Sequence, residues 1–145
     1  MKALALGPVI FDPALVSRVT LAQGDAGGAP ARDKGVTVRQ LMMQPLAGID
    51  NKVAAVVTVE YAPGASSTAH RHPGHVFAYV LEGSVVSEVD PGTPITYERG
   101  QMWYEAPMHT HRVSRNASAS KPAMLLAFII LDKGQPITVG AHTTT

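Results

Sequence analysis

The pattern of apolar and polar residues after residue 35 predicts a chain built from short β-strands. Apolar and β-branched residues gather in runs of three to nine, and turns rich in Gly, Pro and Asp separate these runs. The strand-like runs cover residues 36–44, 53–61, 76–81, 84–89, 95–98, 102–104, 111–114 and 123–131. No long helical periodicity follows residue 20. Many short strands at regular spacing are typical of an all-β sandwich or barrel.

Three parts of the chain differ in composition. Residues 1–35 predict a short N-terminal arm followed by a mobile loop, because the stretch QGDAGGAPARDKG cannot bury apolar surface. We expect residues 36–132 to form the barrel and residues 133–145 to form a C-terminal tail. Within the barrel, the run 123–131 (AMLLAFIIL) is apolar at every position. This run predicts a central strand that is covered on both faces.

Composition excludes several classes of function. The chain has 145 residues, which suits one domain, and its net charge of +1 argues against nucleic acid as a partner. No segment is long and apolar enough for a membrane helix. Gly7-Pro8 interrupts the first apolar run too early for a secretory signal, so we expect a cytoplasmic protein. The chain has no cysteine, so any bound metal must have nitrogen and oxygen ligands.

The histidines are concentrated in one part of the sequence. Five of the six lie between residues 70 and 111. His70 and His72 are two residues apart, so in an extended backbone their imidazoles project to the same side of a sheet. Two imidazoles on one rigid face provide half of a transition-metal site. The segment 108–111 offers a further histidine, His111, for the other half.

Two motifs in this region resemble those of the cupins, which are small barrels of the double-stranded β-helix (jelly-roll) type. In the first motif a glycine is followed after five residues by His-x-His, then by a glutamate and a closing glycine; Gly64, His70, His72 and Gly83 match it. The chain resembles the second cupin motif at Gly100, Pro107, His111 and Asn116, with one-residue differences in spacing. The resemblance implies an all-β double-stranded β-helix and a metal site at His70, His72 and His111.

One departure from the first motif concerns the metal ligands. At the position separated from Gly83 by six residues, where the family has a glutamate ligand, this chain has Val76. The resemblance therefore carries over three imidazole ligands and no carboxylate. A divalent cation held only by neutral imidazoles keeps its full charge and acts as a strong Lewis acid.

Four further residues are candidates for the site. His75 would become a fourth ligand if a bulge after Pro73-Gly74 reset the strand alternation, although regular alternation points it away. His109 would share the face of His111 if that strand began early, or would contact substrate at the rim of the barrel. Tyr79 and Tyr104 are candidates for the substrate pocket, although packing in the core or barrel lining is the simpler explanation for both.

The resemblance implies a function as well as a fold. Three-histidine iron sites occur in cupin oxygenases, so we expect an Fe(II)-type dioxygenase or related oxidoreductase for a small oxygenated molecule, with Fe, Ni, Zn, Cu or Mn as the divalent metal. A non-catalytic metal-binding or small-molecule-binding module is an alternative, which the lack of an obvious general base favours. A metal-assisted isomerase or lyase is another. The apolar N-terminal segments and final strand also predict a homodimer.

Overall fold

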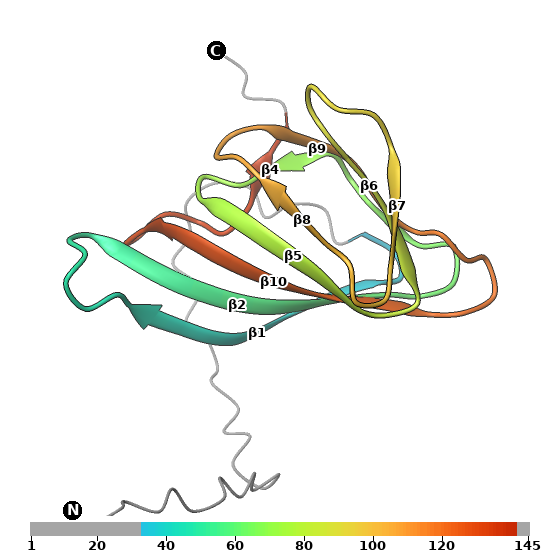
Figure 1. The fold of residues 1–145 in the computed structure, drawn as a ribbon, viewed down its shortest axis with the longest axis horizontal. Coiled ribbons are helices and arrows are strands. Elements are labelled where there is room, and N and C mark those ends of the chain that lie inside the picture. The colour runs from blue at the N-terminus through green and yellow to red at the C-terminus, as the bar shows by residue number, and fades with distance from the viewer. Residues whose placement is uncertain (1–32, 142–145) are drawn as a thin grey trace, which may run out of the picture.

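The computed structural model describes residues 33–141, and within this range the chain forms strands and no helix (Figure 1). The strands are β1 Val36–Pro45, β2 Lys52–Tyr61, β3 Ser66–Ser67, β4 His70–Arg71, β5 His75–Glu82, β6 Ser84–Val89, β7 Ile95–Glu98, β8 Met102–Glu105, β9 Thr110–Asn116, β10 Ala123–Asp132 and β11 Val139–Gly140. The described residues include no helix that could cross a membrane. The predicted all-β architecture is confirmed.

The strands form two antiparallel sheets that lie against each other as two layers (Figure 1). One sheet has the order β1-β2-β10-β5-β8, and we call it the front sheet. The other has the order β11-β4-β9-β6-β7, with β3 paired to β9. Gly83 joins β5 of the front sheet to β6 of the other. This residue has a φ of +67°, and a Cβ there would lie 2.6 Å from the carbonyl oxygen of Pro122. The abrupt crossing between sheets therefore requires glycine.

The core lies between the two sheets and consists mainly of inward-facing Val, Leu, Ile and Ala side chains. In β10 burial alternates residue by residue, and Leu125, Ile129 and Leu131 are almost fully buried. This strand is central, since it pairs with both β2 and β5, as the apolar run predicts. Double coverage, however, is wrong for the described residues. Leu126, Phe128 and Ile130 face outward and are only half-buried.

The predicted strands agree with the observed ones to within a residue or two at most ends. The predicted terminal segments lie only partly within residues 33–141. The predicted N-terminal arm and loop fall almost wholly on residues 1–32, which lie outside the described residues. The tail predicted from residue 133 contains β11, which pairs with β4 beside the histidines. The barrel therefore extends beyond residue 132.

Candidate metal centre

The structure brings the three predicted histidines together on the inner side of the second sheet. His70 of β4 and His111 of β9 are direct cross-strand partners, and His72 follows β4 by one residue. One ring nitrogen from each histidine lies within 4.8 Å of the other two. The ring centroid of His70 lies 4.9 Å from that of His72 and 5.1 Å from that of His111. The expected convergence of imidazoles from two separate motifs is confirmed.

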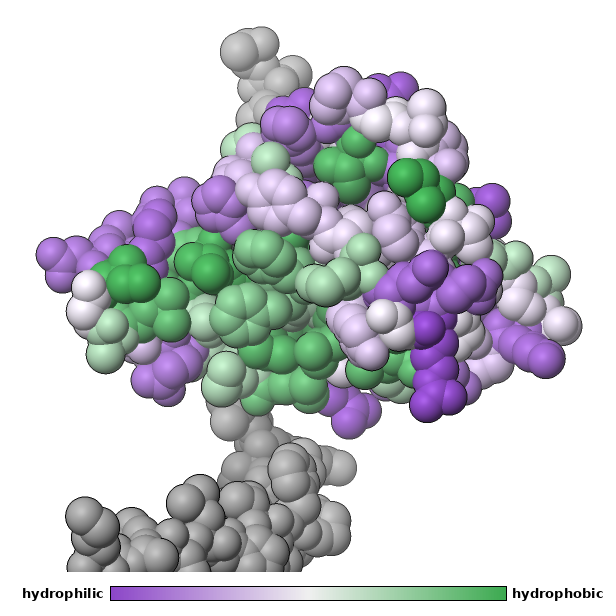
Figure 2. Space-filling model, viewed as in Figure 1, coloured by the Kyte–Doolittle hydropathy of each residue, from purple (hydrophilic) through white to green (hydrophobic). Residues whose placement is uncertain are grey.

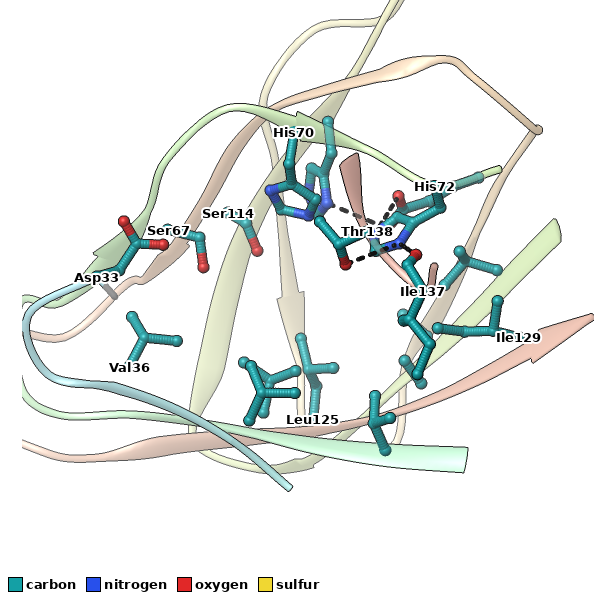
Figure 3. Close-up of a pocket in the computed structure, with 18 of the residues that line it drawn as sticks. Asp33, Val36, Ser67, His70, His72, Ser114, Leu125, Ile129, Ile137 and Thr138 are labelled. Atoms are coloured by element: carbon teal, nitrogen blue, oxygen red, sulfur yellow. Dashed lines mark hydrogen bonds and ion pairs between the residues drawn. The ribbon is translucent and has the colours of Figure 1, made fainter. Parts of the chain in front are cut away.

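Backbone carbonyls fix the orientation of two of these rings. The Nδ1 atom of His70 lies 2.7 Å from the carbonyl oxygen of Thr68. Nδ1 of His72 lies 2.7 Å from the carbonyl oxygen of Ile137, a contact that Figure 3 marks. Because a carbonyl only accepts, each Nδ1 carries the hydrogen and each Nε2 keeps a free lone pair. Metal-binding histidines in proteins are held in this way.

Burial keeps the three imidazoles neutral at pH 7. Loss of solvent lowers the pKa of His70, and it lowers the pKa of His72 to about 4 with a smaller contribution from the nearby His70. Burial, followed by the charges that His70 and His72 would carry, lowers the pKa of His111 to about 3. Neutral imidazole is the form that binds a metal.

Sequence reasoning missed Glu105, a carboxylate that the structure places among these histidines. Its side chain is 3% exposed. Oε1 accepts a hydrogen bond from Nε1 of Trp103 at 2.9 Å and lies 3.2 Å from Nδ1 of His111. Oε2 lies 3.8 Å from Nε2 of His72 and is the one buried side-chain polar atom in residues 33–141 without a hydrogen-bond partner. Burial raises the pKa of Glu105 to about 7, against the lowering effect of the Trp103 hydrogen bond.

Glu105 left only a weak signal in the sequence. The predicted strand 102–104 ends one residue before it, and extending that strand would have placed Glu105 on the same face as Trp103. Which strand lies opposite could not be read from the sequence. The site therefore contains a carboxylate, contrary to the expectation from the sequence that it has neither a carboxylate nor a general base.

A cavity of about 850 Å³ lies between the sheets, with the histidines on one side. Figure 3 shows Val36, Leu125 and Ile129 opposite the histidines, on the front sheet. The apolar lining of the cavity comes mainly from β1, β2, β5 and β10. It consists of Val36, Val38, Val57, Val59, Val76, Ala78, Leu125, Ala127 and Ile129. The cavity is large enough for a small organic molecule.

A hydroxyl cluster forms a second polar region of the cavity wall. The Tyr61 hydroxyl and Ser114 Oγ are hydrogen-bonded at 2.6 Å, and Ser67 Oγ donates to the same tyrosine at 3.5 Å. All three residues line the cavity. Burial raises the pKa of Tyr61, so its hydroxyl stays protonated at neutral pH and can donate.

The four additional sequence candidates lie outside the cavity. His75 is exposed on the outer face of β5, where its Nδ1 lies 2.7 Å from the Tyr104 hydroxyl. Tyr79 and Tyr104 are 41% and 49% exposed on that same face. No bulge resets the alternation at the start of β5, so Val76 points inward and His75 outward. His109 is exposed in the turn before β9, which begins only at Thr110.

Comparison with known proteins places this geometry in a family. A sequence profile described as "Cupin domain" matches residues 57–129, which is half of the chain. This chain is a cupin. The match spans both histidine motifs and contains strands β3 to β9 in full, so the predicted double-stranded β-helix is confirmed. No curated protein matches the chain.

Solved structures share the fold at low sequence identity. One is an uncharacterised double-stranded β-helix protein from Klebsiella pneumoniae, with a TM-score of 0.60, 16% identity, and coverage of 77% of this chain and 89% of that chain. The DMSP lyase DddQ from Ruegeria pomeroyi has a TM-score of 0.58 and 18% identity, over 72% of this cupin and 51% of that chain. The polyketide cyclase RemF from Streptomyces resistomycificus has a TM-score of 0.54 and 18% identity, covering 77% and 75%.

The residues present fit a divalent transition metal. Three neutral imidazole nitrogens converge in a buried site, and a buried carboxylate oxygen beside them lacks a partner. Nitrogen and oxygen donors in this combination suit Fe, Ni, Zn, Cu and Mn.

Proposed function

We propose that this cupin is a metal-dependent enzyme that acts on a small oxygenated organic molecule. The observation that carries the proposal is the convergence of three neutral imidazoles on one side of a largely apolar cavity of about 850 Å³. A purely structural metal site would have no need of adjoining space for a second molecule.

The metal would be held by His70, His72 and His111, and iron is the form we propose first. A divalent transition metal there would supply Lewis-acid chemistry, and iron would in addition support reaction with dioxygen. We therefore propose an Fe(II)-type dioxygenase or related oxidoreductase. Ni, Zn, Cu and Mn remain the other metals that the donor set suits.

The chain's own residues would bind and orient the substrate. The valine, leucine and isoleucine side chains of the front sheet would cover an apolar substrate body and exclude water. Oxygen atoms of the substrate would face the histidines, which favours an enolate or a β-diketone. The protonated Tyr61 hydroxyl would donate a hydrogen bond to a second polar group.

A second candidate is an oxygen-independent lyase or cyclase. It is supported by two proteins of similar fold, one named as a DMSP lyase and the other as a polyketide cyclase. Their identities of 18% show the fold alone. The third candidate is a binding module that captures a small molecule without turning it over.

Turnover measured with and without oxygen separates the three candidates. Protein loaded with Fe(II), and separately with Ni, Zn, Cu and Mn, would be incubated with β-diketones, phenolic acids and thiols. We expect substrate-dependent oxygen consumption by the iron form. Product formation that continues without oxygen would instead support the lyase or cyclase. Ligand binding without product in every metal form would support the module.

A further inference from the structure

We propose that Glu105 is the fourth protein ligand of this metal centre. It would supply from β8 the carboxylate that the first cupin motif lacks at Val76. The inference rests on the proposed metal site, and it changes the nature of that site. A centre with three imidazoles and one carboxylate carries one unit less positive charge than the all-histidine centre that the sequence implies.

The strand register brings Glu105 to the position of the absent glutamate. β5 and β8 are antiparallel, and Val76 and Glu105 are direct cross-strand partners. Side chains of directly opposite residues project from the same face of a sheet, with their Cβ atoms about 5 Å apart. Val76 is buried and lines the cavity, and so does Glu105. A carboxylate on β8 therefore enters the site beside the place where the family's motif puts one on β5.

Contacts within the site leave one carboxylate oxygen without a hydrogen bond. Because Nδ1 of His72 donates to the Ile137 carbonyl, its Nε2 presents a lone pair. That lone pair lies 3.8 Å from Oε2 of Glu105, which has no hydrogen-bond donor. Two electron-rich atoms facing each other in a buried site are costly unless a cation or a proton lies between them. Metal–nitrogen and metal–oxygen bonds of about 2.1 Å each allow one cation to reach both atoms.

The other oxygen of Glu105 is held in place by its neighbours. Nε1 of Trp103 donates to Oε1 at 2.9 Å, and Trp103 is buried on the same face of β8. This hydrogen bond fixes the direction of the carboxylate and leaves Oε2 turned toward His72. Such support from a neighbouring donor is what metal-binding carboxylates have in other proteins.

The alternative occupant of this contact is a proton, which would make Glu105 a buried neutral acid with a structural role. Metal binding by variants distinguishes the two. The probe is Co²⁺, added to metal-free protein, with affinity from competition with a chelator and coordination from the visible absorption spectrum. The matched control is Glu82→Gln, an exposed glutamate at the end of β5.

For a fourth ligand, Glu105→Gln weakens Co²⁺ binding about 100-fold or more and changes the spectrum, since even groups behind the ligands contribute about 10–100-fold. Glu82→Gln matches the wild type. Wild-type affinity and spectrum in Glu105→Gln would overturn the inference and leave the three-histidine site intact. Failure of the wild type to bind Co²⁺, Fe²⁺, Ni²⁺ or Zn²⁺ would overturn the proposed function itself.

Relocating the carboxylate provides a rescue test that a structural acid would not pass. Glu105→Val removes the ligand, and Val76→Glu combined with Glu105→Val places a carboxylate at the family's motif position. We expect the double variant to bind Co²⁺ at least tenfold more tightly than Glu105→Val does. Its visible absorption spectrum should resemble that of the wild type. Equal, weak binding by both variants, each with a folded circular dichroism spectrum, would count against a ligand role.

Discussion

The inner and outer faces of the antiparallel strand pair β5 and β8 share the same strands but have opposite surroundings. Inward positions hold Val76 and Ala78 opposite Glu105 and Trp103, all buried against the cavity. Outward positions hold Phe77 and Tyr79 opposite Tyr104 and Met102, and these four are 38–57% exposed. Consecutive residues therefore belong to different environments. Chemical type alone does not assign a residue to the site, because tyrosines and a histidine lie outside while a carboxylate lies inside.

The largest expected effect distinguishes a histidine that lines the cavity from one on the outer face of β5. His72→Ala removes a ring that lies beside two other imidazoles and Glu105, so we expect loss of detectable Zn²⁺ binding, more than 100-fold. His75→Ala removes an exposed ring whose partner is the Tyr104 hydroxyl, and we expect wild-type affinity. Isothermal titration of metal-free protein with Zn²⁺ measures both. Loss of binding in His75→Ala would mean that the outer face contributes to the centre.

Local patterns in the sequence accounted for most of the fold and for the three histidines. Strand positions follow from apolar alternation between turns, and His70 and His72 share a face because they are two residues apart. Convergence with His111 came from the motif resemblance. The role of Glu105 depends on pairing between β5 and β8, whose register with Val76 is a long-range property. His75 and His109 stayed open as candidates because a bulge or an early strand start cannot be judged from composition.

The outer face also bears on the predicted homodimer. We define the outer patch as the outward-facing apolar and aromatic residues of the front sheet, where Figure 2 shows a broad hydrophobic area. It consists of Val56, Phe77, Tyr79, Met102, Tyr104, Leu126, Phe128 and Ile130. A large exposed apolar area is typical of an interaction surface. We propose a second copy of the chain as the partner, in agreement with the sequence expectation.

Phe77 and Tyr104 are cross-strand partners within the outer patch, with ring centroids 5.3 Å apart. Phe77→Asp combined with Tyr104→Asp should raise the dimer dissociation constant at least tenfold, because aromatic residues contribute strongly to such interfaces. Ile95→Asp is the matched control, since Ile95 is an exposed apolar residue on β7 of the other sheet. Sedimentation velocity over a range of concentrations measures the effect. A wild-type monomer at all concentrations would refute the homodimer.

The smallest expected effect is on the free energy of unfolding of two tyrosine variants. Tyr61→Phe removes a buried hydroxyl and leaves Ser114 without that partner, so we expect a loss of about 1 kcal/mol in the free energy of unfolding. Tyr104→Phe removes an exposed hydroxyl, and we expect a change within about 0.5 kcal/mol. Urea unfolding of both variants measures this. Equal losses would mean that His75 and Tyr104 form a structural contact as important as the hydroxyl cluster. The inner face would then differ from the outer face in its chemistry but not in its contribution to stability.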